Sequence, residues 1–273
     1  MPDIVIHGVA SAGYAGLAWH FWSTRWRRKA PSPRGLKPWE RAAILAPFAI
    51  HGWLLYFDVF AAPQLRFGFA QALSVMLWLG VALYWFESLF YSLEGMEPLV
   101  LPLAALAVPL PLLFPGLAST ALHSGALEFK LHLALAMIAY SLFVIAILHA
   151  TLMALAERQL HRKGASLITN LPPLLTLERL LFRVIGAAFV FLTLTLVTGM
   201  AFSETLFGRA VRFDHKTVFA VLSWLAFGGL LAGRWLYGWR GRTALRWTLT
   251  GFVLLVLAYV GSRFVLEVIL GRG

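Results

Sequence analysis

Long runs of apolar residues constrain this chain more than any other feature. A membrane-spanning helix needs about 20 apolar residues, because the hydrocarbon core of a bilayer is roughly 30 Å thick. The sequence contains stretches of about that length with no charge in their interior, and we expect each to form a membrane helix. The eight expected spans are 4–22, 42–60, 67–86, 99–116, 131–155, 184–202, 217–233 and 244–262.

The composition agrees with that expectation. Hydrophobic residues make up 60% of the 273 residues and charged residues 13%, whereas a soluble domain averages about 45–50% and about 25%. We therefore predict an all-α, polytopic membrane protein, with residues 1–273 forming a single transmembrane domain. Pro102, Pro109, Pro111 and Pro115 interrupt the fourth run, so we expect a kinked or broken helix there.

The basic residues predict the orientation. Most of the 23 Lys and Arg residues lie in the alternate connections 23–41, 156–183 and 234–246. The positive-inside rule makes these connections cytoplasmic and puts both termini on the external, periplasmic side of a bacterial inner membrane. The formal net charge of +11 is then explained by anchoring to anionic lipid, and no nucleic-acid partner is expected. The first residues carry no basic side chain and the basic cluster follows the first run, which is the reverse of a removable signal peptide.

The chain has no cysteine. This excludes a disulfide framework, a thiolate metal site, a CxxC motif and covalent haem attachment. The sequence also shows no nucleophile–base pair, no phosphate-binding glycine loop and no paired carboxylates within a span. We therefore do not expect an enzyme.

Histidines are the residues most able to bind a ligand. His7, His123, His132 and His215 fall at or beyond the external ends of the expected spans, and His51 falls near the middle of one. We expect His7 and His123 to be solvated or hydrogen-bonded loop residues, whereas His51 must find a partner inside the bundle. On the fifth span, His132 and His149 point about 100° apart and lie about 25 Å apart, so one flat cofactor cannot engage both. Near the end of the last span, Glu267 can pair with Arg263 one turn earlier.

Two kinds of metal chemistry fit the external histidines. A zinc site could use His123, His132 and His215 with Asp214. Haem needs one or two axial imidazoles, an apolar slot and cations for its propionates. His132, His123 or His215, together with Arg209, Arg212 or Lys216, could supply these groups.

Several segments resemble a known family. FKLHLALAMIAYSLFVIAIL (129–148) resembles the helix that carries the first external haem-ligating histidine of CcsA/ResC-type cytochrome c assembly proteins. RFDHKTVFAVLSWLAFGGLL (212–231) resembles the end of that family's tryptophan-rich segment and the helix that follows it, with Asp214 and Lys216 on matching positions. The size, together with LPPLLTLERLLF and YGWRGR, is similar to the smaller YpjD/HemX branch.

The resemblance implies an inner-membrane protein that binds haem b non-covalently near the external face. His132 would be the axial iron ligand, and His123, His215 or His51 could add a second. Asp214, Lys216 and Arg212 would lie at the cofactor. The chain departs from the family in SETLFGRAVRFDHK (203–216), which has no tryptophan, and in two places where the family's further histidines give way to the surroundings of Arg263 and Arg234.

We expect a haem carrier or assembly factor in the lipid bilayer, with cytochrome c biogenesis or haem-synthesis proteins as partners. In a variant of this reading, the basic loops act on haem synthesis through cytoplasmic partners. Two alternatives stay open. One is a small-solute or ion transporter that uses His51 and the broken fourth helix, and the other is a scaffold without a ligand.

Overall fold

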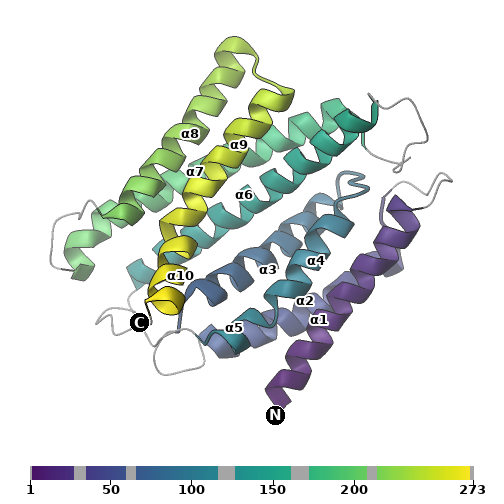
Figure 1. Ribbon diagram of the computed structural model, residues 1–273, viewed down its shortest axis with the longest axis horizontal. Helices are drawn as coiled ribbons and strands as arrows, with labels where there is room; N and C mark the ends of the chain where they lie inside the picture. The colour runs from purple at the N-terminus through teal and green to yellow at the C-terminus, as the bar shows by residue number, and fades with distance from the viewer. Residues whose placement is uncertain are drawn as a thin grey trace.

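The computed structural model describes residues 2–27, 35–59, 66–115, 127–160, 172–207 and 214–270. Every element in these ranges is a helix (Figure 1). The first half of the chain forms α1 (Pro2–Phe21), a π-helical turn (Trp22–Trp26), α2 (Pro38–Val59), α3 (Phe69–Glu87), α4 (Glu97–Ala107) and α5 (Leu110–Leu113). The second half forms α6 (Leu127–Leu160), α7 (Leu174–Phe207), α8 (His215–Tyr237) and α9 (Gly241–Val256). Beyond α9 the helix continues through the π-helical turn Leu257–Gly261, α10 (Ser262–Phe264) and a further π-helical turn, Val265–Ile269.

Six helices are long and apolar enough to cross a membrane, which confirms an all-helical membrane protein. They are Pro38–Val59, Phe69–Glu87, Leu127–Arg158, Leu174–Phe202, His215–Tyr237 and Gly241–Ile269. The apolar segment Glu97–Leu113 is shorter and is broken between α4 and α5 at Val108 and Pro109, as its prolines predict. The 20-residue α1 is not among the six, because glycines and two histidines lower its hydropathy.

Several helices extend beyond the expected membrane spans. The run expected at 131–155 is part of α6, which extends over Leu127–Leu160, and the run expected at 184–202 is part of α7, which begins at Leu174. Hydropathy marks the part of a helix that lies in hydrocarbon, whereas helical hydrogen bonding continues through the polar turns at each end.

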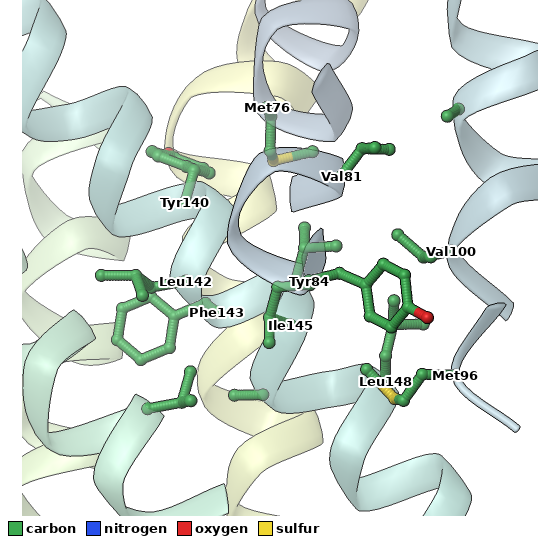
Figure 2. Packing of buried hydrophobic residues seen from close by; sticks show 14 of the residues in the cluster. Met76, Val81, Tyr84, Met96, Val100, Tyr140, Leu142, Phe143, Ile145 and Leu148 are labelled. Carbon is green, nitrogen blue, oxygen red and sulfur yellow. The ribbon is translucent and has the colours of Figure 1, made fainter. Parts of the chain in front are cut away.

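The helices form two groups that share an interface. In the first group α1 packs on α2 and α4, and α3 packs on α2 and α4; in the second, α6, α7, α8 and α9 pack in a closed ring, each against the next. Helix α3 joins the groups by packing against α6 (Figure 1). Figure 2 shows part of this shared core, where the ring of Tyr84 on α3 lies among Val100, Met96 and Leu148.

The first and last described residues lie at the same end of the bundle (Figure 1), which we call the termini end. Because neighbouring helices alternate in direction, α6 and α8 start at the termini end and α7 finishes there. The last turns of the chain and the start of α3 also reach this end. The described residues on either side of the three basic connections lie at the opposite end.

Candidate functional site

The residues expected at a cofactor site are only partly described. His132, Asp214, His215, Lys216 and His51 lie in the described ranges, whereas His123 and Arg212 lie outside them, as does Arg209. The site is therefore built from His132 and from the helix ends that surround it.

His132 lies in the second turn of α6 and is directed at α7. Its Nδ1 atom is 3.0 Å from Oγ1 of Thr198 on α7. The ring also lies against Gly199, where a Cβ atom would be only 3.1 Å from the imidazole Cε1. Glycine at this position allows the imidazole to approach the α7 backbone closely, and the side chain is half-buried. The imidazole therefore points into the protein and not out into lipid.

The hydrogen bonds of Thr198 determine the tautomer of this histidine. The Thr198 hydroxyl has one proton, and its oxygen lies 2.8 Å from the carbonyl oxygen of Leu194 and 3.1 Å from that of Thr195. When the hydroxyl proton points to one of these carbonyl oxygens, the hydroxyl oxygen accepts from the imidazole, and we adopt this arrangement for the site. Nδ1 of His132 consequently carries the proton, and Nε2 keeps its lone pair. Among the described residues the imidazole contacts the Thr198 hydroxyl at Nδ1 and also interacts with the backbone of Thr195. A metal-binding imidazole has this arrangement, with one nitrogen free and the other held by a second group.

The four helices of the second group have part-exposed ends around this position. Within the terminal segments 127–135, 193–202, 214–222 and 263–270 no described side chain is fully buried. One or two turns deeper the packing is dense: Phe143 and Phe227 are both fully buried, and their rings stack 3.8 Å apart. The described side chains of this group are thus part-exposed at the termini end and closely packed deeper in the bundle.

Two cations belong to the same level of the bundle. Tyr140 of α6 donates a hydrogen bond to the carbonyl oxygen of Leu255 on α9 (2.7 Å). His132 lies eight residues before Tyr140, and Arg263 lies eight residues after Leu255. Both residues therefore lie about 12 Å nearer the termini end than this hydrogen bond. Lys216, in the first turn of α8, is half-buried and lies within electrostatic range of Arg263. Arg263 was not expected in the site; it makes a long ion pair with Glu267 (3.9 Å), the partner that its spacing predicts, and it also lies over the ring of Tyr259, 5.9 Å from the centroid.

Asp214 and His215 have simpler surroundings. The Asp214 carboxylate accepts hydrogen bonds from the backbone N–H of Thr217 (3.0 Å) and from its hydroxyl (3.1 Å) and so caps α8. Burial acts to raise the pKa of Asp214, but the hydrogen bonds from Thr217 outweigh it and the pKa is lowered. This carboxylate is engaged with its own helix. His215 is exposed.

The structure does not bring His51 or His149 to this site. His51 packs among α1, α2 and α3, where its Nε2 atom lies 2.9 Å from the Ser74 hydroxyl, so the expectation that it needs a partner within the bundle is confirmed. His149 faces α3, with its Nε2 atom 3.5 Å from Glu87. His7 was expected to be a solvated or hydrogen-bonded loop residue: it is hydrogen-bonded, through Nδ1 to the Asp3 carbonyl oxygen (2.8 Å), but it lies in α1 and is 3% exposed, so its placement in a solvated loop is wrong. Within the described ranges no cluster of three or more His, Cys, Asp or Glu could hold a metal ion, so the zinc alternative has no support there.

Sequence reasoning missed Thr198 and Gly199. Both lie on a predicted span in TLVTGM, and a threonine–glycine pair within an apolar helix is an ordinary signal of close helix packing. Which helix approaches that pair depends on the register between α6 and α7, and the sequence does not give this register.

Comparison with known proteins gives two kinds of match. Residues 43–270 match the family described as Cytochrome C assembly protein. The inner membrane protein YpjD of Escherichia coli (strain K12) is 36% identical over 138 residues, which are 50% of this chain and 52% of that protein. The chain thus covers about half the length of this relative. No solved structure matches.

Two further relatives differ in coverage. An uncharacterized 28.8 kDa protein of Azospirillum brasilense is 34% identical over 207 residues, covering 73% of this chain and 76% of that protein. The cytochrome c biogenesis protein CcsA of Nostoc punctiforme is 32% identical over 98 residues, covering 36% of this chain and 26% of that protein.

Proposed function

Since this chain is a multi-pass inner-membrane protein that belongs to the cytochrome c assembly protein family, we propose that it binds haem b non-covalently at the termini end of α6–α9. The observation that carries the proposal is the state of His132. Its Nδ1–H is fixed on Thr198, so that Nε2 is available as an axial ligand to iron. Without cysteine the chain cannot form thioether bonds to the porphyrin.

The surrounding residues fit the other parts of a haem. Its propionates need cations, and Lys216 and Arg263 approach the same level from α8 and α10. Its faces need apolar contacts, and the four helix ends offer part-exposed side chains for such contacts at this level. The haem iron would supply a Lewis-acidic position for the imidazole nitrogen. The protein's part is to hold the ring tautomer, neutralise the carboxylates and leave the porphyrin edge accessible for transfer.

The haem would be handed on and not chemically changed. An opening at a membrane face suits a carrier or assembly factor, and the partners would be cytochrome c biogenesis or haem-synthesis proteins. A second axial ligand would come from His123 or from the exposed His215, and His51 is too far inside the first helix group to serve.

We propose an eight-span topology with the termini end external. In this arrangement α1 and the broken α4–α5 segment complete the six longer spans. The three basic connections lie at the opposite end, where anionic lipid on the cytoplasmic side would attract them. The haem site would then face the periplasm.

The test is a haem titration of the detergent-purified protein. We expect the wild type to bind haem with a Soret band and His132→Ala to lose it. His132→Gly should regain the band when imidazole is added, which separates loss of the ligand from loss of the fold. His20→Ala is the control, because His20 lies in the last turn of α1, at the end of the bundle opposite the proposed haem site. A wild type that shows no Soret band with added haem, or a His132→Ala protein that binds as tightly as wild type, contradicts the proposal.

A further inference from the structure

A second group of buried polar residues lies in the first helix group, away from His132. His7 and Tyr14 of α1 and His51 of α2 are 3%, 0% and 1% exposed, and Ser74 of α3 is fully buried. The Asp58 side chain, near the end of α2, is 32% exposed. Polar side chains in a membrane-embedded interior carry a cost unless they are paired. Their grouping therefore needs an explanation.

The residues form two levels between antiparallel helices. Seven residues separate His7 from Tyr14 on α1, and seven separate His51 from Asp58 on α2, so each pair shares one helix face. At the outer level, nearer the termini end, Nε2 of His7 lies 3.5 Å from Oδ2 of Asp58. At the inner level, the rings of Tyr14 and His51 meet edge to face with centroids 5.9 Å apart. The two levels lie about 10 Å apart along the helices.

Polar atoms at both levels are enclosed and have no hydrogen-bond partner. At the inner level these are the Tyr14 hydroxyl and Nδ1 of His51, whose other nitrogen is bonded to Ser74. At the outer level they are Nε2 of His7 and Oδ2 of Asp58, because 3.5 Å is too long for a strong bond. An enclosed polar atom with no partner costs about 1–3 kcal/mol. Internal water bound to several such atoms removes that cost.

We propose that internal water fills the α1–α2 interface between these two levels and lets His51 exchange protons with the solution at the termini end. The part-exposed Asp58 is the entrance, His7 is the next group, and Tyr14 with His51 is the end of the path. His7 is bound to the Asp3 carbonyl oxygen through Nδ1, so it takes up and returns a proton at Nε2, and internal water carries the proton between this atom and Nδ1 of His51. The titratable groups that face the path are Asp3, His7 and Tyr14 from α1 and Asp58 from α2, and α3 contributes the Ser74 hydroxyl.

The path has one open end. Beyond Ser74 the buried side chains of Met76, Val81 and Val100 form an apolar layer between α3 and α4, which separates the path from the buried Tyr84 and Glu97 farther from the termini end (Figure 2). A hydrated path that stops at an apolar core loads and unloads a proton from one side and does not conduct across the membrane. This site and the proposed haem site use different helices, so either can fail without the other.

The absence of cysteine provides a direct test of water access. Ser74→Cys introduces a single thiol beside His51, and Ser141→Cys is the matched control. Ser141 is equally buried on α6, but its hydroxyl is bonded to the Met137 carbonyl oxygen (2.6 Å) and no unpaired polar atom lies beside it among the described groups. The detergent-purified variants are exposed to silver ions, and the remaining thiol is counted with a maleimide after denaturation. We expect Ser74→Cys to react about tenfold faster, as a water-accessible thiol should.

Variants of His7 test the route. His7→Leu should close it and slow Ser74→Cys to the rate of the control, whereas His7→Gln, which remains polar, should not. His20→Leu at the other end of α1 should also leave the rate unchanged. All rates are compared on variants that elute as single species. Equal rates for Ser74→Cys and Ser141→Cys, or no slowing by His7→Leu, overturn the proposal.

Proton exchange itself is read from deuterium uptake at the imidazole C2 position of His51, measured by mass spectrometry. That exchange needs a protonated ring and access to water. We expect uptake in the wild type and strong slowing in His7→Leu. If the Ser74→Cys thiol reacts quickly but the His51 ring takes up no deuterium, the interface is hydrated without proton exchange. That result would refute the proposal as stated.

Discussion

Replacing Thr198 by valine is the sharpest test of how His132 is held. Valine has nearly the shape of threonine, so packing against α6 should be kept while the acceptor for the imidazole Nδ1–H is lost. The helix backbone should not change, because the bond from the Thr198 hydroxyl to Leu194 only adds to a carbonyl already within the helix. The substitution therefore changes the orientation and tautomer of one ring and little else.

The expected loss can be worked from this one hydrogen bond. A neutral hydrogen bond contributes about 0.5–1.5 kcal/mol net, and about 1.4 kcal/mol corresponds to tenfold in a dissociation constant. Outer partners of metal-binding histidines are typically worth about 10–100-fold in affinity, the larger effects belonging to charged acceptors. Because Thr198 is a neutral acceptor, we expect the Kd for haem to rise about tenfold.

The assay is a haem titration followed at the Soret band, with Thr198→Ser as the matched control. Serine keeps the hydroxyl and loses only a methyl group, so its Kd should stay close to that of wild type. The pH dependence of binding gives a second readout: without the acceptor the proton can move to Nε2, and the iron must then compete for that nitrogen. If Thr198→Val binds haem as tightly as Thr198→Ser, the imidazole is not held by this hydroxyl and the argument from tautomer is refuted.

The remaining predictions concern stability, measured as thermal unfolding in detergent. Asp214→Ala should cost about 1 kcal/mol by removing the α8 cap, with Asp214→Asn nearly neutral; because the pKa of Asp214 is lowered in the fold, this contribution is present above the unfolded pKa and lost as pH falls through the lowered one. Phe227→Ala should cost about 3–5 kcal/mol through loss of the buried ring stack with Phe143. Glu178 pairs with Arg234 (2.5 Å) and Arg240 (3.1 Å), so Glu178→Ala should cost about 2 kcal/mol. Arg240→Ala should have a much smaller effect because that side chain is 62% exposed.

The helices were predictable because membrane insertion depends on local composition. An apolar run of about 20 residues must satisfy its own backbone hydrogen bonds, so helix is the only local choice. The break between α4 and α5 was predictable for a similar reason, since Pro109 lacks the N–H that a continuous helix needs. The bounds of α6 and α7 were not, because Glu157 and Arg158 continue a helix outside the hydrocarbon without contributing hydropathy.

Individual side chains were predictable only where one helix sufficed. The pairing of Arg263 with Glu267 follows from spacing along a single helix, and the structure has it. That His51 needs a partner follows from its depth, but Ser74 as the partner depends on the register between α2 and α3. Thr198 beside His132 depends likewise on how α6 and α7 meet. Contacts between helices are set by the packing of whole surfaces, and a single sequence carries no direct record of that packing.

The two proposed sites differ in how they relate to the family. The match begins at residue 43, within α2, so every helix that forms the His132 site lies inside it. Helix α1 lies outside the match and supplies His7 and Tyr14, two of the five polar side chains in the hydrated path. The haem proposal should therefore extend to relatives that keep His132 and Thr198, whatever precedes their second span. Proton exchange at His51 should instead depend on α1, and a relative whose first helix lacks counterparts of His7 and Tyr14 should bind haem yet take up no deuterium at the equivalent of His51.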